Sequence, residues 1–291
     1  MIVCEVPSGR LGNAIFRYMA GAIFLYNYEN SERVTYIDGL HNITRNTIII
    51  NDHDFLSFMN NYEKNGIFPD LNTGAICVFN GYFQFDLYKK YRKQILKYMK
   101  SHKDHELFCT DYKNGEKFYV KDILKFPKTL PPLPKYNIVV HVRLEDFIFN
   151  KHVIHPAVLK KILKELTATD SDAAEKPNIC LISNKPTKII EFEYLSYFMD
   201  KFNISFQTND IITDFHIMCN AKILVCSHST ISWCAAILSK HVEKVYIPDQ
   251  VMHSHQSFSQ PHDNTVRYKN RVCGEDELRE YFAKHGKKNI K

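Results

Sequence analysis

Short apolar runs alternate with longer amphipathic segments along the whole chain. Apolar, often β-branched runs predict buried strands, and apolar residues spaced three and four apart predict helices. Strands are predicted at residues 1–6, 33–38, 46–50, 75–83, 137–142, 178–183, 222–227 and 244–248. Helices are predicted at residues 12–29, 54–64, 86–102, 156–166, 187–202, 212–221, 230–239 and 275–286. This alternation is typical of the α/β class.

A proline-rich segment interrupts the alternation near the middle of the chain. Residues 127–137 hold four of the eleven prolines, and proline fits neither a helix interior nor a central strand. The strand–helix pattern restarts after this segment. We therefore expect two α/β domains, residues 1–130 and 131–291, with the prolines in the connection between them.

Composition favours a globular enzyme or binding protein over a nucleic-acid-binding protein. The 291 residues are 45% hydrophobic and 24% charged, and the net charge of +6 is spread along the chain. The eight cysteines form no CxxC pair, so we interpret them as buried apolar residues of a reducing compartment. No apolar segment approaches the ~20 residues of a membrane span, and the start does not resemble a signal peptide. These features predict a cytoplasmic protein of bacterial or viral type, or a Golgi enzyme only if an anchor was removed.

Candidate chemistry begins directly after the first predicted strand. Gly9 and Gly12 allow a tight turn, and Asn13 stands where the following helix presents free N–H groups to an anion. The alternative is a plain glycine turn with Asn13 as the helix cap. The stretch contains neither the dinucleotide fingerprint nor a P-loop. A second stretch, residues 80–86, is an aromatic cluster that is typical of a core.

A third stretch ends the strand predicted at 137–142. His141, Arg143 and Glu145 would project to one face of an extended chain. A buried arginine requires an anion, and the guanidinium of Arg143 suits a phosphate or a carboxylate. The alternative is an internal pair between Arg143 and Glu145 or Asp146.

A fourth stretch joins the strand at 222–227 to the helix at 230–239. Ser227, Ser229 and Thr230 would place hydroxyls beside the N–H groups of a helix start, which is typical of a phosphate site. The alternative is a simple N-cap by Ser229 or Thr230. In the helix before this strand, Asp214 is expected to cap the helix or to contact a base, and Thr187 is expected to cap the helix at 187–202.

The order of these four stretches resembles the α-1,2-fucosyltransferase family. The matching segments read GRLGNAIFRY (9–18), GYFQ (81–84), HVRLED (141–146) and SHSTISWCAA (227–236). The first segment is also similar to the GRFGNQ start of protein O-fucosyltransferases. The resemblance extends from residue 1 to about residue 250. It implies a GT-B-like fold of two facing Rossmann-like domains, with the acceptor on the N-terminal domain and the nucleotide sugar on the C-terminal domain.

The resemblance implies inverting, metal-independent transfer of fucose from GDP-fucose to a glycan hydroxyl. Arg143 would hold the diphosphate, His141 would lie near the nucleoside, and Asp214 would lie near the guanine. The implied donor-binding residues are His141, Arg143, Asp214, Ser227, Ser229, Thr230, Ser232, Gly9, Arg10 and Gly12. The implied catalytic residues are Arg143, Asn13, Glu145 and Asp146. Glu145, Asp146 or the leaving phosphate would accept the acceptor's proton, and Asn13 would orient the acceptor.

The chain departs from the family pattern at four positions. Ala14, Leu144, Glu145 and Cys234 replace the family's glutamine, second arginine, glycine and second tryptophan. Leu144 removes a positive charge beside the expected diphosphate. Two alternatives therefore remain: a related transferase for another nucleotide sugar, or an inactive homologue that binds a nucleotide or glycan.

A metal-dependent transferase is the remaining alternative. His253, His255 and His262 form an HxH plus a third histidine, but no DxD follows a predicted strand. The closest acidic stretch, residues 51–55, fits a helix start better. We therefore expect no metal cofactor, and as partners only a nucleotide sugar and a glycan acceptor.

Overall fold

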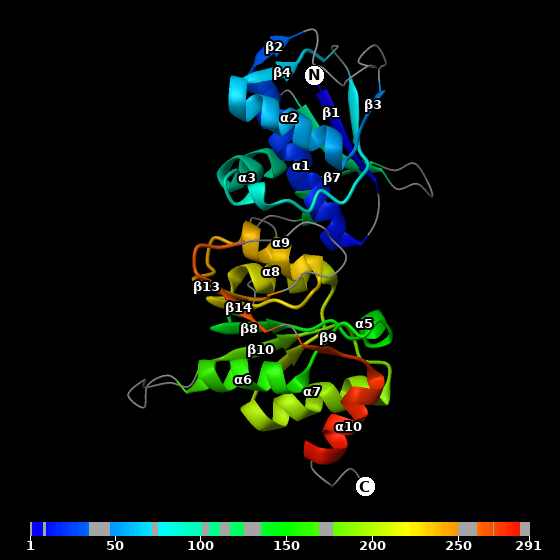
Figure 1. The fold of residues 1–291 in the computed structure, drawn as a ribbon, viewed down its shortest axis with the longest axis vertical. Helices are drawn as coiled ribbons and strands as arrows, with labels where there is room; N and C mark the ends of the chain where they lie inside the picture. Colours follow the sequence, from blue (N-terminus) through cyan, green and yellow to red (C-terminus); the bar gives the residue numbers. More distant parts are fainter. Residues whose placement is uncertain are drawn as a thin grey trace. The chain divides into compact units, whose positions relative to one another are not determined.

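A computed structural model describes residues 2–7, 10–34, 47–71, 75–100, 105–110, 117–124, 135–168, 177–249, 261–269 and 271–285. The chain divides into two compact units, Met1–Pro131 and Pro132–Lys291 (Figure 1). The predicted division at residues 130 and 131 lies one residue from this boundary. The acceptor and donor roles assigned to the two domains stay predictions.

The N-terminal unit is built on a five-stranded sheet in the order β3-β5-β1-β6-β7. The first four strands in this order are parallel, and β7 is antiparallel to β6. The strands are β1 Ile2–Pro7, β3 Thr47–Ile50, β5 Ile76–Phe79, β6 His105–Thr110 and β7 Lys117–Tyr119. Two further strands, β2 Glu32–Val34 and β4 Ile67–Pro69, pair with each other. The sequence pattern missed β4, β6 and β7.

Helix α1 (Leu11–Glu29) forms the centre of this unit. Most of its side chains are buried, as expected of a helix that is apolar on nearly every face. Phe24 packs edge-on against Phe58, Phe68 and Phe79. The other helices are α2 Asp52–Asn65, η1 Asp86–Tyr88, α3 Arg92–Lys100 and α4 Val120–Leu124.

The GYFQ segment is held to α2 by one carboxylate. The side chain of Asp52 accepts hydrogen bonds from the backbone N–H groups of Tyr82 (3.0 Å) and Phe83 (2.7 Å). Gly81 passes so close that a β-carbon there would lie 2.4 Å from the Asp52 carboxylate. Arg17 of α1 also donates to the Gly81 carbonyl at 2.7 Å. The segment is therefore part of the core framework, as its aromatic composition predicts.

The acidic stretch at residues 51–55 begins a helix, as predicted. Asn51 is the N-cap of α2, and its side chain accepts from the Asp54 N–H. Asp54 in turn accepts from the Asn51 N–H, which completes a capping box. Both aspartates of the DxD-like stretch thus have backbone partners.

The C-terminal unit contains a six-stranded parallel sheet in the order β11-β10-β8-β12-β13-β14. The strands are β8 Ile138–His141, β10 Ile179–Ile182, β11 Ser205–Gln207, β12 Ile223–Val225, β13 Lys244–Pro248 and β14 Thr265–Tyr268. Numbered by their succession in the chain, these strands follow the order 3-2-1-4-5-6 of the Rossmann fold. The predicted α/β class is confirmed for each unit taken by itself, and the C-terminal unit has the Rossmann strand order.

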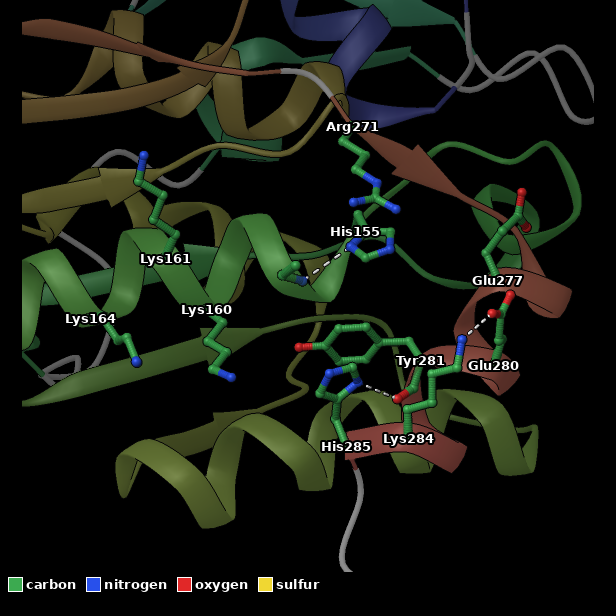
Figure 2. A pocket seen from close by; sticks show the side chains of 11 residues that line it. His155, Lys160, Lys161, Lys164, Arg271, Glu277, Glu280, Tyr281, Lys284 and His285 are labelled. Carbon is green, nitrogen blue, oxygen red and sulfur yellow. Dashed lines mark hydrogen bonds and ion pairs between the residues drawn. The ribbon is translucent and has the colours of Figure 1, made fainter.

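Helices cover both faces of the C-terminal sheet. Helices α6 (Pro156–Thr167), α7 (Ile189–Phe202) and α10 (Glu275–His285) lie on one face, and α8 (Ile211–Asn220) and α9 (Thr230–Leu238) lie on the other (Figure 1). A surface hollow lies between α6 and α10 (Figure 2). The short elements are α5 Glu145–Phe149, β9 Val153–Ile154 and β15 Val272–Cys273. Among the helices in the described ranges, none has the length and apolar character needed to cross a bilayer.

Two local predictions in this unit are wrong. The strand predicted at 137–142 ends at His141, and α5 begins at Glu145. Positions 141, 143 and 145 therefore do not share one strand face. Helix α7 begins at Ile189, with Lys188 rather than Thr187 at the N-cap. The N–H groups of Thr187 and Lys188 both donate to the Glu191 carboxylate, which satisfies this helix start instead.

The Asp52 contacts predict that Asp52→Ala destabilises the N-terminal unit by about 1–3 kcal/mol, because two backbone N–H groups lose their acceptor. Urea unfolding followed by circular dichroism measures this change. Asp70→Ala, which removes an exposed carboxylate, is the control and should unfold like the wild type. Equal unfolding midpoints for the two variants would contradict the structural role of Asp52.

Candidate nucleotide-sugar site

The position between β8 and β12 is where a sheet of this strand order is expected to bind a ligand. β8 pairs with β10 on one side and with β12 on the other, and the order of succession reverses at this point. In open parallel sheets, ligands bind beyond the carboxyl ends of the strands at such a switch point. His141 is the last residue of β8, and Ser227 follows β12 by two residues. Two predicted site residues therefore stand at the expected place.

A hydrogen bond joins these two residues. The Nδ1 atom of His141 lies 2.8 Å from the Ser227 hydroxyl, and its direction depends on the tautomer of the imidazole. Both residues are buried. Burial lowers the pKa of His141 from 6.5 to about 4, because charge is disfavoured away from water. His141 is therefore a neutral hydrogen-bonding group at physiological pH.

The loop after β12 is fixed by buried donors. The Ser227 hydroxyl accepts from the Ser229 N–H at 3.2 Å. The only tryptophan, Trp233, donates its indole N–H to the Ser227 carbonyl at 3.0 Å. The hydroxyl of Tyr268 on β14 donates to the Cys226 carbonyl at 2.7 Å. The tryptophan thus holds the serine loop in place.

The serine loop leads directly into α9. Ser229 is the N-cap, and its side chain makes no capping hydrogen bond. Thr230 is the first helical residue and is partly exposed. Ser232 is fully buried, and its hydroxyl donates to the Ser229 carbonyl at 2.9 Å. Direct contact between Ser232 and a donor phosphate is therefore not supported, because this hydroxyl is occupied in holding the loop.

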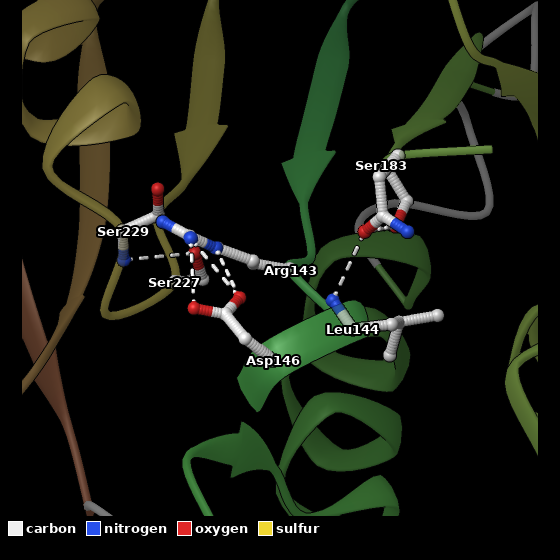
Figure 3. A network of polar contacts seen from close by, with 7 residues as sticks. Arg143, Leu144, Asp146, Ser183, Ser227 and Ser229 are labelled. Carbon is white, nitrogen blue, oxygen red and sulfur yellow. Dashed lines mark hydrogen bonds and ion pairs between the residues drawn. The ribbon is translucent and has the colours of Figure 1, made fainter. Parts of the chain in front are cut away.

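Arg143 forms the internal ion pair that the sequence left open. Its Nε and one terminal nitrogen donate to the two carboxylate oxygens of Asp146, each at 3.0 Å (Figure 3). The guanidinium also lies over the Phe147 ring, 4.6 Å from its centroid. Its side chain is 20% exposed. Asp146 uses two of the five N–H donors of the guanidinium, so the outer edge remains able to bind an anion.

Leu144 and Glu145, the two residues next to Arg143 that differ from the fucosyltransferase pattern, have structural explanations. The side chain of Leu144 is fully buried in the core of this unit, where an arginine would have no solvent. Glu145 is exposed and has a φ of 20°, at the edge of the left-handed region that favours glycine. The family pattern has glycine at this position.

A residue that the motif search missed supports the same turn. Asn184 follows β10, and its side-chain oxygen accepts from the Leu144 N–H at 3.2 Å. The Ser183 hydroxyl donates to that oxygen at 3.3 Å (Figure 3). Asn184 follows a predicted buried strand, so the rule that selected His141 and Ser227 could have selected it as well.

Asp214 lies in the first turn of α8 but does not cap it. Asp210 is the N-cap, with its side chain accepting from two N–H groups. The Asp214 carboxylate instead accepts from the backbone N–H (3.3 Å) and the side-chain amide (3.0 Å) of Asn209. Burial raises its pKa, and the bonds from Asn209 oppose that shift. A contact of Asp214 with a base stays a prediction.

The remaining predicted residues belong to the N-terminal unit. Arg10 is the exposed N-cap of α1 without a side-chain capping bond. Gly12 is buried and Asn13 is partly exposed. Both lie inside the first turn of α1, so the alternative of Asn13 as the helix cap is wrong. Gly9 lies outside the described residues.

Of the three histidines considered as an alternative metal site, only His262 lies within the described residues. His253 and His255 lie outside them. The Nδ1 atom of His262 accepts from the Asn264 N–H at 3.2 Å. Within the part of the chain that the structure describes, no three metal-binding side chains are grouped.

Comparisons with known proteins add little to this geometry. No protein-family model and no curated protein sequence matches the chain. Similar solved structures include E. coli heptosyltransferase WaaC with ADP, at 9% identity and a TM-score of 0.42, and the same enzyme with ADP-2-deoxy-2-fluoro heptose, at 9% identity and 0.39. Each match covers 98% of this chain and 100% of the other. Matches with such low identity and TM-scores do not establish a function for this chain. The α/β class is established by the two sheets and their helices.

The low pKa of His141 predicts acid destabilisation. The unfolded chain binds a proton at His141 below about pH 6.5, whereas the folded chain does so only near pH 4. Stability is therefore lost as pH falls from 6.5 to 4, by about 3 kcal/mol from this group. Denaturant unfolding of wild type and His141→Gln across this range measures the difference between the two curves. A difference that does not change with pH would show that His141 titrates normally.

The Tyr268 contact predicts that Tyr268→Phe destabilises the C-terminal unit by about 1–3 kcal/mol, because the buried Cys226 carbonyl loses its donor. Tyr246→Phe is a matched control on the neighbouring strand, since among the described residues the Tyr246 hydroxyl has no hydrogen-bond partner. Thermal unfolding compares the two. Similar losses in both variants would argue against anchoring of the serine loop by Tyr268.

Proposed function

We propose that this protein is a glycosyltransferase that binds a nucleoside diphosphate sugar at the β8–β12 switch point. The observation that carries the proposal is the His141–Ser227 hydrogen bond across the ends of these two strands. It fixes a polar residue on each side of the crevice where Rossmann-like sheets bind nucleotides. Helix α9 begins three residues after the bonded serine, so its N-terminus faces the same end of the sheet.

Two groups are suited to the diphosphate. The first turn of α9 offers backbone N–H groups and the positive end of the helix dipole, with the hydroxyls of Ser229 and Thr230 beside them. The second group is Arg143, held by Asp146 with its outer edge available. The pair pre-orients the guanidinium, which reduces the ordering cost of binding.

The chemistry requires stabilisation of a leaving group. As the bond from the anomeric carbon to the diphosphate breaks, negative charge grows on the phosphate oxygens. Arg143 and the α9 N-terminus stabilise this charge without a metal ion, and loss of one such contact costs on the order of 10²–10³-fold in rate. The proposed reaction inverts the anomeric centre, with the acceptor hydroxyl attacking from the opposite side.

Of the two acidic candidates, Glu145 is better suited to take the acceptor's proton. Asp146 is already engaged by Arg143 through both oxygens. Glu145 is exposed and forms no ion pair among the described residues. Asn13 at the start of α1 is the proposed acceptor-orienting residue.

The finer proposal is transfer of fucose from GDP-fucose to a glycan hydroxyl in the cytoplasm. It is supported by the order of the four motifs and by the position of two of them at the switch point. In this proposal Asp214 lies near the guanine, and Arg10 and Gly12 are further donor-binding residues.

One observation favours a second candidate. Leu144 is committed to the core, and Arg143 already has a carboxylate partner, so the positive charge beside the diphosphate is smaller than in the family pattern. This favours either a different nucleotide sugar or nucleotide binding without transfer.

Calorimetric titration of GDP, UDP, GDP-fucose and UDP-sugars, with and without EDTA, tests these proposals. We expect GDP to bind without metal and Arg143→Ala to weaken it at least tenfold, because a charge-assisted contact is lost. Arg267→Ala, which removes an exposed arginine on β14, should bind as the wild type does.

The outcomes separate the candidates. Stronger binding of UDP would remove the fucose donor but keep the crevice. GDP-fucose binding without turnover on any acceptor would support the inactive homologue. Binding that Arg143→Ala leaves unchanged would overturn the assignment of the site.

A further inference from the structure

The C-terminal unit carries a basic hollow that none of the predicted site residues lines. It has a volume of about 620 Å³ and lies between the start of α6, Arg271 and the last turns of α10 (Figure 2). This volume is within the usual range for small-molecule sites. Five lysine and arginine side chains line it, against two glutamates.

The positive charge of the hollow is only partly compensated. Glu277 accepts a hydrogen bond from the Gly274 N–H at 3.1 Å, and Glu280 pairs with Lys284. Arg271, Lys160 and Lys164 form no ion pair with any described residue. Glu280 is therefore compensated by Lys284, and the single charge of Glu277 stands against the three positive charges of Arg271, Lys160 and Lys164.

His155 adds an N–H donor to this wall. The residue is 6% exposed, and its Nδ1 atom accepts from the Ala157 N–H at 3.1 Å. The neutral ring therefore carries its proton on Nε2. Within the described residues that N–H has no hydrogen-bond partner. Burial is the main cause that lowers the pKa of His155, and the positive charge of Arg271 lowers it further. Both effects favour the neutral imidazole.

An aromatic wall holds His155 in place. The ring of Tyr281 meets the imidazole edge-on, with centroids 5.3 Å apart, and stacks on His285 at 4.4 Å. The Tyr281 and Tyr197 hydroxyls are hydrogen-bonded at 3.1 Å. A ligand would therefore meet a pre-formed surface with an available N–H donor and an excess of positive charge.

We propose that this hollow binds a phosphate group carried by a larger molecule. The guanidinium of Arg271, the ammonium groups of Lys160 and Lys164 and the Nε2–H of His155 are all donors, and together they suit a multiply charged oxyanion. The hollow is far larger than a phosphate, so the rest of the ligand would lie along Tyr281 and the lysine stems. The source is either a soluble phosphorylated molecule or a lipid headgroup.

This site is distinct from the proposed donor crevice. Helices α6 and α10 cover the face of the sheet opposite α8 and α9, whereas the serine loop leads into α9. The proposal does not depend on the identity of the nucleotide sugar, and it stands if the chain has no transferase activity.

Two probes test the proposal on the full chain. Inorganic pyrophosphate is titrated calorimetrically in the presence of saturating GDP, and co-sedimentation is measured with phosphatidylcholine vesicles with and without phosphatidic acid. The test variant is Arg271→Gln/Lys160→Gln. The control is Lys222→Gln/Lys240→Gln, which removes two exposed positive charges elsewhere on the same unit.

We expect the test variant to lose binding to at least one probe by roughly tenfold or more, while the control variant and GDP binding stay unchanged. We also expect the His155 imidazole signals in the NMR spectrum to shift on addition of pyrophosphate. Binding of pyrophosphate identifies a soluble ligand, and binding of only the phosphatidic acid vesicles identifies a headgroup. Absence of binding to both probes, or equal binding by the test and control variants, would overturn the proposal.

Discussion

The parallel pairing of β8 with β12 is the constraint on which the rest of the proposed site depends. At this point of the strand order, the connections that follow the two strands run to opposite faces of the sheet. Ligands of such sheets bind beyond the carboxyl ends of these two strands. The backbone register that joins Val140 to Val225 therefore brings His141 and Ser227 to the same edge. The hydrogen bond between them, the serine loop and the start of α9 all follow from that register.

Burial decides what each polar group at this edge can do. His141 is far from water and remains neutral, so it can position and recognise a ligand but cannot provide charge. Positive charge comes instead from Arg143, which is tolerated in a partly buried position because Asp146 compensates it. The same pairing orients the guanidinium before any ligand arrives. The serine loop is also held in one conformation. Its backbone carbonyls accept hydrogen bonds from the side chains of Trp233, Tyr268 and Ser232.

The two proposed anion-binding surfaces of the C-terminal unit differ in how their charge is balanced. At the switch point the arginine is matched by a carboxylate, and much of the expected anion binding falls to backbone N–H groups. In the hollow between α6 and α10, positive side chains outnumber the carboxylates and are only partly compensated. The first arrangement suits selective binding of one group in a fixed orientation, and the second suits attraction of a more highly charged ligand.

The sequence by itself determined the α/β class, most helices and the short polar stretches at the strand ends, because these depend on local periodicity and on proline and glycine. It did not determine the partners of those polar residues. Only the tertiary structure decided that Arg143 pairs with Asp146, that Ser232 holds a loop, and that Leu144 belongs to the core. It also decided the strand order, and with it the place of the proposed nucleotide site. The grouping of His155 with Arg271 likewise appears only in the tertiary structure. Strand pairing and side-chain contacts join residues far apart in the chain, and no local pattern encodes them.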